Sequence, residues 1–439
     1  TQLFDEAWRT MREQWYDADH DWDELGRKYR EVAMTRSTRH EFQEVVRMML
    51  GELNGSHLGI WGGAESQAAP ARETGRLGLG LEPAEDGWLV TDVVPEGPCD
   101  RESCRLRSGD LLLSVNGRSL ADRPYVPTTH FAEHFEGTVG KRVVLGVLRA
   151  TPDDTLQPEE QDREGRGESE DGGDPGEKET GTDAGPKTPL DADAGARREP
   201  NGKNGSDEGE GEATGEPRSE RVVCRPISDR GLRNLNYERW TDRVRALVEE
   251  RSHGRIGYLH VRGMSVPSLE RFETELFARA NGRDALIIDV RNNGGGWTAD
   301  YLLAILSAPE HAYTVPRGGE RGYPQGRRPL AAWTKPTAVL INERTFSNAE
   351  IFAHAVKTTG RGKLVGQRTF GGVISTGARR LLDGSVLRVP FRGWYVLGTD
   401  HDMDRGGAVP DILVEQPPQD PIDRQAEAAV KALLEELAF

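Results

Sequence analysis

A serine between a short apolar run and an amphipathic segment is the residue best placed in this chain for nucleophilic chemistry. Residues 337–341 are typical of a buried strand, Ser347 follows the next turn, and Ile351 to Lys357 are typical of a helix. At a strand-to-helix turn, free backbone N–H groups and the helix dipole can hold an oxyanion. A structural interpretation stays open, because Ser347-x-x-Glu350 is also a capping box and Ser is a good N-cap.

Other segments hold groups that such a nucleophile needs, since a Ser hydroxyl reacts only when a base takes its proton. Ser56 and His57 lie between a helical and a strand-like segment, and catalytic groups need only meet in space. Gly294 to Gly296 follow a buried strand without the spacing of a dinucleotide fingerprint. They suit close backbone approach by a phosphate or an oxyanion, or form a plain turn. Asp404, in a polar loop, is by itself typical of a solvated loop.

The periodicity of the chain divides it into four segments. Residues 1–72 are predicted to be a helical subdomain that carries Ser56 and His57, and residues 73–150 show strand and hairpin character. Residues 221–439 alternate strands and helices, which indicates an α/β sheet. The predicted fold class is therefore mixed α/β, with a helical N-terminal part, a β-rich domain and an α/β catalytic part.

Residues 151–220 differ from the rest in composition. The 21 acidic and 8 basic residues from Thr151 to Arg218 have a net charge of -13, which leaves -3 of the total of -16 for the remainder. With almost no large apolar residues the segment cannot offset its ordering entropy, so we predict a disordered acidic linker. The nearly neutral remainder argues against nucleic acid as a partner.

Three further observations bear on the setting of the protein. No apolar run approaches 18 residues, so no membrane span is expected. The cysteines, Cys99, Cys104 and Cys224, show no metal-ligand spacing and no even disulfide set, which favours a reducing, cytoplasmic compartment and predicts neither metal nor cofactor. Because the first residue is Thr1 and not Met, we expect a fragment or a processed product.

Two runs in residues 73–150 resemble a PDZ domain. They are Gly78-Leu79-Gly80-Leu81 and the segment from Arg107 to Gly117. The resemblance implies that N–H groups of the Gly78–Leu81 loop hold a peptide carboxylate while the adjacent sheet edge pairs with the peptide.

Several motifs in a fixed order resemble the tricorn proteases, which are relatives of the C-terminal processing peptidases. The motifs are Gly55-Ser56-His57, Asp289-x-Arg-x-Asn-Gly-Gly-Gly296, Ser347-x-x-Glu350, Gly366-Gln-Arg-Thr-Phe-Gly-Gly372 and Asp404-x-x-Gly-x-x-Pro-Asp411. The resemblance covers nearly all of the chain except the acidic insert. It implies a serine endopeptidase that cuts unfolded chains or peptides through an acyl-enzyme. It also implies a homo-oligomer, a hexamer in the resembled family.

The resemblance also assigns roles to residues. It makes Ser347 the nucleophile, His57 the base and Ser56 a bridge to an acidic residue, with an oxyanion hole formed by the backbone N–H groups of Gly296 and Asn348. C-terminal processing peptidases use a Lys 25 residues after the Ser, but Gly372 stands there, so a Ser–Lys dyad is not expected.

At two positions the chain departs from the tricorn pattern. Asp404 stands for the family's Glu and is one methylene shorter. Thr314 stands for the acidic residue that accepts basic P1 side chains, so we expect hydrophobic P1 residues to be favoured. An inactive PDZ-containing scaffold that binds peptides is the alternative function. A Ser esterase is a weaker one, because the Gly-x-Ser-x-Gly elbow is missing.

Overall fold

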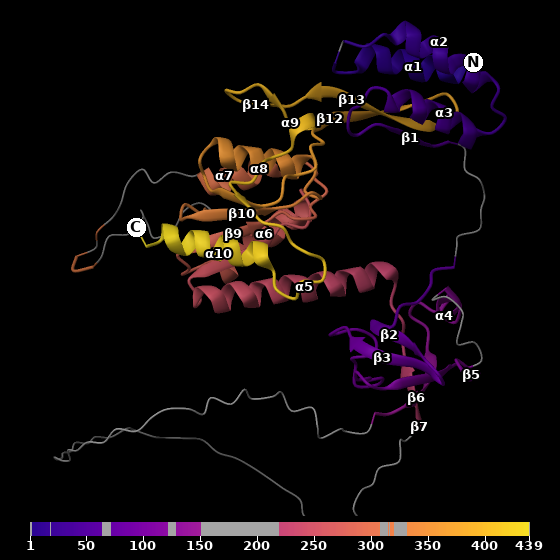
Figure 1. Ribbon diagram of the computed structural model, residues 1–439, viewed down its shortest axis with the longest axis vertical. Coiled ribbons are helices and arrows are strands. Elements are labelled where there is room, and N and C mark those ends of the chain that lie inside the picture. The colour runs from indigo at the N-terminus through magenta and orange to yellow at the C-terminus, as the bar shows by residue number, and fades with distance from the viewer. Residues whose placement is uncertain are drawn as a thin grey trace, which may run out of the picture. The chain divides into compact units, whose positions relative to one another are not determined.

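A computed structural model describes most of the chain as two compact units (Figure 1). The described residues are 2–17, 19–63, 72–121, 129–150, 219–307, 315, 317–319 and 332–438. Unit 1 combines Thr1–Glu73 with Asp229–Phe439, and unit 2 is Thr74–Ser228. The predicted linker lies outside the described residues except for 219 and 220.

A five-stranded parallel sheet forms the centre of unit 1, with strand order β16-β11-β10-β9-β8. The strands are β8 (Ile256–His260), β9 (Ala285–Asp289), β10 (Thr337–Ile341), β11 (Lys363–Gly366) and β16 (Ile412–Leu413). Every residue of β8, β9 and β10 is buried. Their continuous apolar sequences are those of strands covered on both faces.

Helices cover both faces of this sheet. Leu286 and Ile288 of β9 pack into one core with α6 (Val266–Arg279), α7 (Ala299–Ser307) and α8 (Asn348–Thr358). Ala285 and Ile287 point to the opposite face and pack with α5 (Asp229–Ser252) and α10 (Arg424–Glu436). The alternation of side chains along a strand thus supplies two cores from one strand. The predicted mixed α/β class is confirmed.

The N-terminal helices are part of unit 1 and pack on a second, three-stranded sheet. They are α1 (Gln2–Gln14), α2 (Trp22–Met34) and α3 (Arg39–Gly51), and the sheet is β1 (Gly59–Gly62), β13 (Ser385–Gly393) and β12 (Ile374–Arg380) in that order. Phe4, Met11 and Met49 share a core with Leu387 and Val389. A capping box formed by Thr38 and Glu41 begins α3. The turn between α3 and β1, which carries Ser56 and His57, is therefore held at both ends.

Unit 2 is a β-rich domain whose main sheet has the order β2-β3-β4-β6-β7, with β5 paired to β4. Its elements are β2 (Leu79–Ala84), β3 (Gly87–Val93), β4 (Leu111–Val115), β5 (Arg118–Ser119), α4 (Thr129–Glu133), β6 (Val143–Leu148) and β7 (Ser219–Cys224). Of the loop predicted to hold a peptide, Gly78 has φ of +72° and the other residues begin the edge strand β2.

The expected boundary at residue 221 differs from the observed one. Strand β7 pairs antiparallel with β6 over its whole length, from Val143 opposite Cys224 to Leu148 opposite Ser219. Residues 221–228 consequently belong to unit 2, and unit 1 resumes at Asp229. The sequence pattern could not show this, because a lone strand after a long insert carries no sign of its partner.

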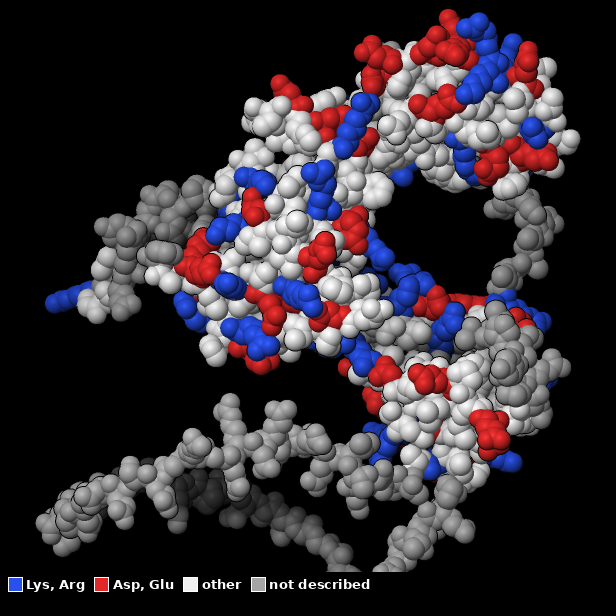
Figure 2. Space-filling view, viewed as in Figure 1, with Lys and Arg blue, Asp and Glu red and all other residues white. Residues whose placement is uncertain are grey.

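Charges of both signs are mixed over the face of unit 1 drawn in Figure 2. This pattern agrees with the nearly neutral composition of the chain outside the acidic insert. Among the described residues, no helix combines the length and apolarity that a membrane crossing requires.

Candidate active site

Ser347 and His57 meet in unit 1 although 290 positions separate them in the chain. The Nε2 atom of His57 lies 3.0 Å from Ser347 Oγ, and its Nδ1 atom lies 2.6 Å from Ser56 Oγ. The three side chains form a continuous hydrogen-bonded row. A base within hydrogen-bond reach of a hydroxyl, and itself oriented by a third group, is the arrangement that activates a serine nucleophile.

Ser347 stands at the N-cap position of α8 in a conformation that non-glycine residues seldom adopt. Its φ is 58° and its ψ is -123°, and a backbone of this kind persists only where its surroundings enforce it. Gly295 is one of those surroundings: a Cβ there would lie 2.7 Å from Ser347 Cβ and 2.8 Å from the Phe346 carbonyl oxygen. The triple glycine therefore lets the β9 loop approach the nucleophile turn closely.

The buried carboxylate of Glu350 fastens this turn to the loop after β11. Its Oε1 accepts from the backbone N–H groups of Ser347 at 3.0 Å and Gly372 at 2.9 Å. Its Oε2 accepts from Thr369 Oγ1 and from the Gly371 N–H, both at 2.6 Å. Burial raises the pKa of Glu350, although the four hydrogen bonds favour its charged form. The residue therefore does more than the capping box of the sequence prediction requires.

His57 is held in a setting that keeps its imidazole neutral. Its ring stacks on Phe346, with centroids 4.7 Å apart and an interplanar angle of 21°. Burial, with a smaller repulsion from Arg388, lowers the pKa of His57 to about 4. A neutral imidazole can take up a proton at neutral pH, as a general base must.

Asp404 lies beside Ser56, in the short helix α9 (Met403–Gly406). Its Oδ2 accepts from the backbone N–H of Ser56 at 3.1 Å. Its Oδ1 is buried and has no hydrogen-bond partner among the described residues. The hydrogen bond between Asp404 and Ser56 thus involves the Ser56 backbone N–H, whereas the resemblance implied a bond to the Ser56 side chain. The shorter carboxylate accounts for the difference, because its oxygens lie one methylene closer to their own backbone.

Two backbone N–H groups beside Ser347 are suited to an oxyanion. Gly296 has φ of +147°, and a Cβ there would lie 1.8 Å from the Met264 carbonyl oxygen. Both neighbours of Gly296 bond to Met264. The Met264 N–H donates to the Gly295 carbonyl, and the Met264 carbonyl accepts from the Trp297 N–H. Asn348 begins α8, and its Oδ1 accepts from the Ala299 N–H at 2.9 Å. No described residue accepts a hydrogen bond from the backbone N–H of Gly296 or Asn348.

A hollow of about 410 Å³ adjoins the side chains of Ser56, His57 and Asp404. It is lined by residues of the α3–β1 turn, of the nucleophile turn, of the loop after β11 and of α9, namely Gly51, Asn54, Gly55, Ser56, His57, Phe346, Phe370, Gly371 and Asp404. Phe370 is exposed and contacts Phe346 edge-to-face, with centroids 5.0 Å apart. The two aromatic rings give the hollow an apolar wall beside the base.

The structure thus brings together Ser347, His57, Ser56 and Asp404, with Gly296 and Asn348 around the nucleophile. Thr314 lies outside the described residues. The loop from Gly78 to Leu81 belongs to unit 2, whereas the four side chains belong to unit 1. Sequence reasoning missed the stacking of Phe346 on His57. It also missed the anchoring by Glu350 of a loop about 20 positions away, for which the Gly371–Gly372 pair was the available signal.

Comparisons with known proteins match two segments of the chain to known domains. Residues 255–414 match the model of peptidase family S41, and residues 1–51 match the tricorn protease C1 domain. Tricorn protease homolog 1 of Streptomyces coelicolor is 29% identical over 95% of this chain and 33% of its own length. The tricorn protease of Thermoplasma acidophilum is 27% identical over 99% of this chain and 35% of its own length.

A solved structure shows the same fold. The crystal structure of the tricorn protease covers all of this chain and 37% of the other, with a TM-score of 0.69 and 22% identity. The chain spans about a third of the length of the curated relatives it matches. Residues 255–414 thus match peptidase family S41 and residues 1–51 match the tricorn protease C1 domain, and the chain is similar to tricorn proteases over nearly its whole length.

Proposed function

We propose that the chain is a serine endopeptidase that hydrolyses peptide bonds through an acyl-enzyme on Ser347. The observation that carries this proposal is the hydrogen-bonded row from Ser347 Oγ through the His57 ring to Ser56 Oγ. An N-cap serine without catalytic function has no need of an imidazole nitrogen 3.0 Å from its hydroxyl, nor of a backbone with φ of 58°.

The first step is proton transfer from Ser347 Oγ to His57 Nε2 as Oγ attacks the carbonyl carbon of the substrate. For Nε2 to accept, Nδ1 must carry the other ring hydrogen and donate it to Ser56 Oγ. The oxygen of the tetrahedral intermediate is then negatively charged. The N–H groups of Gly296 and Asn348 donate to it, and the N-terminus of α8 adds its dipole.

The second half of the reaction reverses these roles. His57 gives its proton to the departing amine, which leaves the acyl group as an ester on Ser347. A water molecule then loses a proton to His57 and attacks the ester, and His57 returns that proton to Ser347 Oγ as the acid departs. In this scheme Asp404 and Ser56 act as positioning groups, since the base must keep one tautomer and one orientation throughout.

The substrates proposed are unfolded polypeptides and peptides. The hollow beside His57 is open and has an apolar wall formed by Phe346 and Phe370, which suits an extended chain. We further propose that unit 2 binds peptide termini as a PDZ-like domain, because the loop at Gly78 leads into β2, which is an edge strand of the sheet that the described residues form. A homo-oligomer and a preference for hydrophobic P1 residues stay predictions of the resemblance and of Thr314.

A fluorophosphonate probe tests the nucleophile. It should label the protein once, at Ser347, and Ser347→Ala should abolish both labelling and peptide hydrolysis. His57→Ala should lower the rate by several orders of magnitude, because only binding and the oxyanion hole then contribute. Thr38→Ala, which removes the cap of α3 and about 1 kcal/mol of stability, is the matched control and should label normally.

The alternative function, an inactive scaffold, makes the opposite prediction. A folded protein that binds peptides but takes no label at Ser347 would support it. Undiminished turnover by a clean Ser347→Ala preparation would overturn the mechanism itself.

A further inference from the structure

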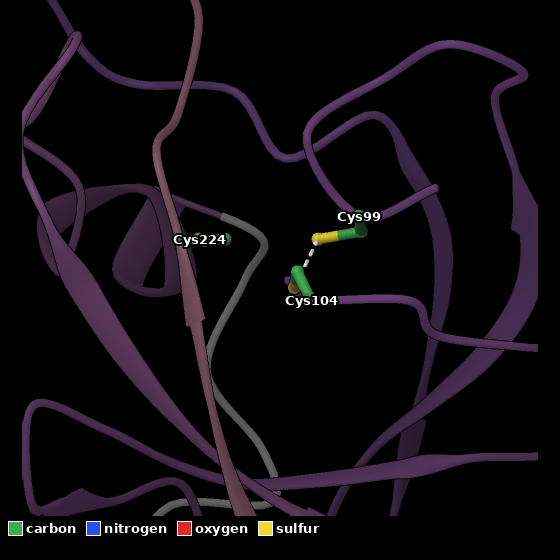
Figure 3. A group of neighbouring side chains, drawn as sticks. All are labelled: Cys99, Cys104 and Cys224. Atoms are coloured by element: carbon green, nitrogen blue, oxygen red, sulfur yellow. Dashed lines mark hydrogen bonds between the residues drawn. The ribbon is translucent and has the colours of Figure 1, made fainter. Parts of the chain in front are cut away.

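The three cysteines of the chain, far apart in the sequence, come together in the core of unit 2. The Sγ atoms of Cys99, Cys104 and Cys224 all lie within 4.8 Å of one another, and those of Cys99 and Cys104 are 3.5 Å apart (Figure 3). All three residues are buried and reduced. Cys99 and Cys104 come from the loop between β3 and β4, and Cys224 ends β7. Sequence spacing predicted no such group, since the third thiol follows the long insert.

The triangle of sulfur atoms has the dimensions of a metal site. With metal–sulfur bonds of about 2.3 Å, an ion at the centre of three thiolates holds their sulfur atoms about 4 Å apart. The observed separations, from 3.5 Å to no more than 4.8 Å, bracket this value. Small adjustments of side-chain torsion suffice to bring three sulfur atoms to one ion.

The surroundings restrict which ion can bind. Among the described residues, no histidine or carboxylate joins the three thiols as a fourth ligand. The neighbouring core is apolar and includes Leu106, Phe135 and Val222. Structural zinc takes four ligands in a tetrahedron, and this core offers three. Soft thiolate ligands favour copper(I), and copper(I) forms stable three-coordinate complexes.

We propose that Cys99, Cys104 and Cys224 bind one copper(I) ion in a three-coordinate thiolate site. Binding involves no electron transfer: each thiol that coordinates releases its proton to solvent, and the ion stays copper(I). The guanidinium of Arg149, which pairs with Asp110 and acts electrostatically on Cys104, opposes the negative charge of the thiolates. The site would join the β3–β4 loop to the strand that follows the insert.

The test is titration of the full reduced chain, without oxygen, with copper(I) supplied as its bicinchoninate complex. We expect one ion per chain to be withdrawn from the chelator. X-ray absorption of the loaded protein should show sulfur ligands only, at about 2.3 Å. Copper should also raise the melting temperature, because a ligand that binds only the folded state stabilises it.

Variants separate this site from adventitious binding. Each thiolate is one of three ligands, so Cys99→Ala, Cys104→Ala and Cys224→Ala should each weaken copper binding about 100-fold. Val222→Ala removes apolar volume from the same core but keeps all three thiols, and it should bind copper normally.

Four results would overturn the proposal, and three of them need no variant. One is failure of the parent chain to take one copper(I) from the chelator, and another is nitrogen or oxygen ligands in the absorption spectrum. The third is unchanged affinity in a folded Cys224→Ala variant. A disulfide between Cys99 and Cys104 in protein isolated without reductant would likewise contradict it, by assigning the thiols to redox chemistry.

Discussion

At the scale of single residues, the candidate site depends on burial as much as on residue type. His57 lies against Phe346 and near Arg388, and both burial and the nearby positive charge disfavour its protonated form. A histidine in water is half protonated near pH 6.5. The pKa of about 4 therefore decides over which pH range the proposed base can work.

The first prediction for single residues concerns the fall of kcat/KM at acid pH. Protonated His57 cannot accept the Ser347 proton, so kcat/KM should stay level from neutral pH and fall only near pH 4. Arg388→Met removes a repulsive positive charge and should move this limb to higher pH. Rates measured from pH 3.5 to 8 with one peptide substrate check both. A limb at pH 6.5 in the parent enzyme would show that burial does not act on the base.

The free energy of unfolding should also decrease as the pH falls. Because the pKa of His57 is lower in the folded than in the unfolded state, the unfolded chain binds the proton more readily between pH 6.5 and about 4. The contribution of His57 to stability is therefore full above pH 6.5 and is lost as the pH falls toward 4. Urea unfolding of the parent and of His57→Ala should converge in this range.

The second prediction concerns the charge and length of the side chain at position 404. Asp404→Asn removes the negative charge beside Ser56 and should lower kcat far more than KM. Asp404→Glu places a carboxylate oxygen one methylene further, toward the Ser56 side chain, and should retain or raise activity. Rescue by Glu distinguishes positioning of Ser56 and His57 from a merely structural contact. If both variants match the parent, the orienting acid lies elsewhere.

At the scale of elements, the parallel sheet accounts for the meeting of Gly296 and Ser347. Strands β9 and β10 are neighbours in register, with Asp289 opposite Leu340, so the loops that follow them leave the same edge of the sheet. Ligand sites in open α/β sheets lie at these carboxyl ends. His57 arrives from a different element, the turn between α3 and β1, which the second sheet holds.

Glu350 carries the prediction for this scale. Glu350→Gln replaces one of two acceptor oxygens by an amide donor, although four groups donate to this side chain. At least one buried N–H therefore loses its acceptor, which should lower the free energy of unfolding by about 1–3 kcal/mol. We expect a lower melting temperature and about a hundredfold slower labelling of Ser347, because the nucleophile turn loses its anchor. Glu343→Gln, at an exposed position four residues before Ser347, is the control and should change neither. Normal labelling by a folded Glu350→Gln protein would contradict the positioning role.

At the scale of the whole molecule, the ends of the acidic insert meet across a strand pair. Leu148 at the end of β6 lies opposite Ser219 at the start of β7. A link between them needs only to turn a hairpin. Loop closure depends weakly on length, at about 0.6 kcal/mol for each doubling. The length of the insert therefore contributes little to the stability of unit 2.

Replacing residues 155–215 by a short Gly/Ser linker should consequently leave the melting temperature and the rate of peptide hydrolysis nearly unchanged. The matched control extends the deletion through Cys224 and removes β7, and unit 2 should then unfold because β6 loses its partner. Calorimetry and the peptide assay measure both effects. A short-linker variant that fails to fold would show that the insert itself contributes ordered structure.

Local sequence patterns specify the elements of this protein and their types. The buried runs of β9 and β10, the capping box before α3 and the strand-helix alternation after residue 221 are local patterns, which periodicity and cap chemistry specify over a few residues. Motif order also made Ser347 and His57 candidates for one site, although no local rule brings them within 3.0 Å.

Which groups share an environment depends on the packing of distant segments and could not be read from local patterns. This packing placed Phe346 on His57, directed Asp404 to the backbone of Ser56, and paired β7 with β6 so that Cys224 joined Cys99 and Cys104. Burial, pKa and ligand geometry depend on neighbours that are distant in the chain. The physical reason is that local propensities act over a few residues, whereas packing sets distances between residues hundreds of positions apart.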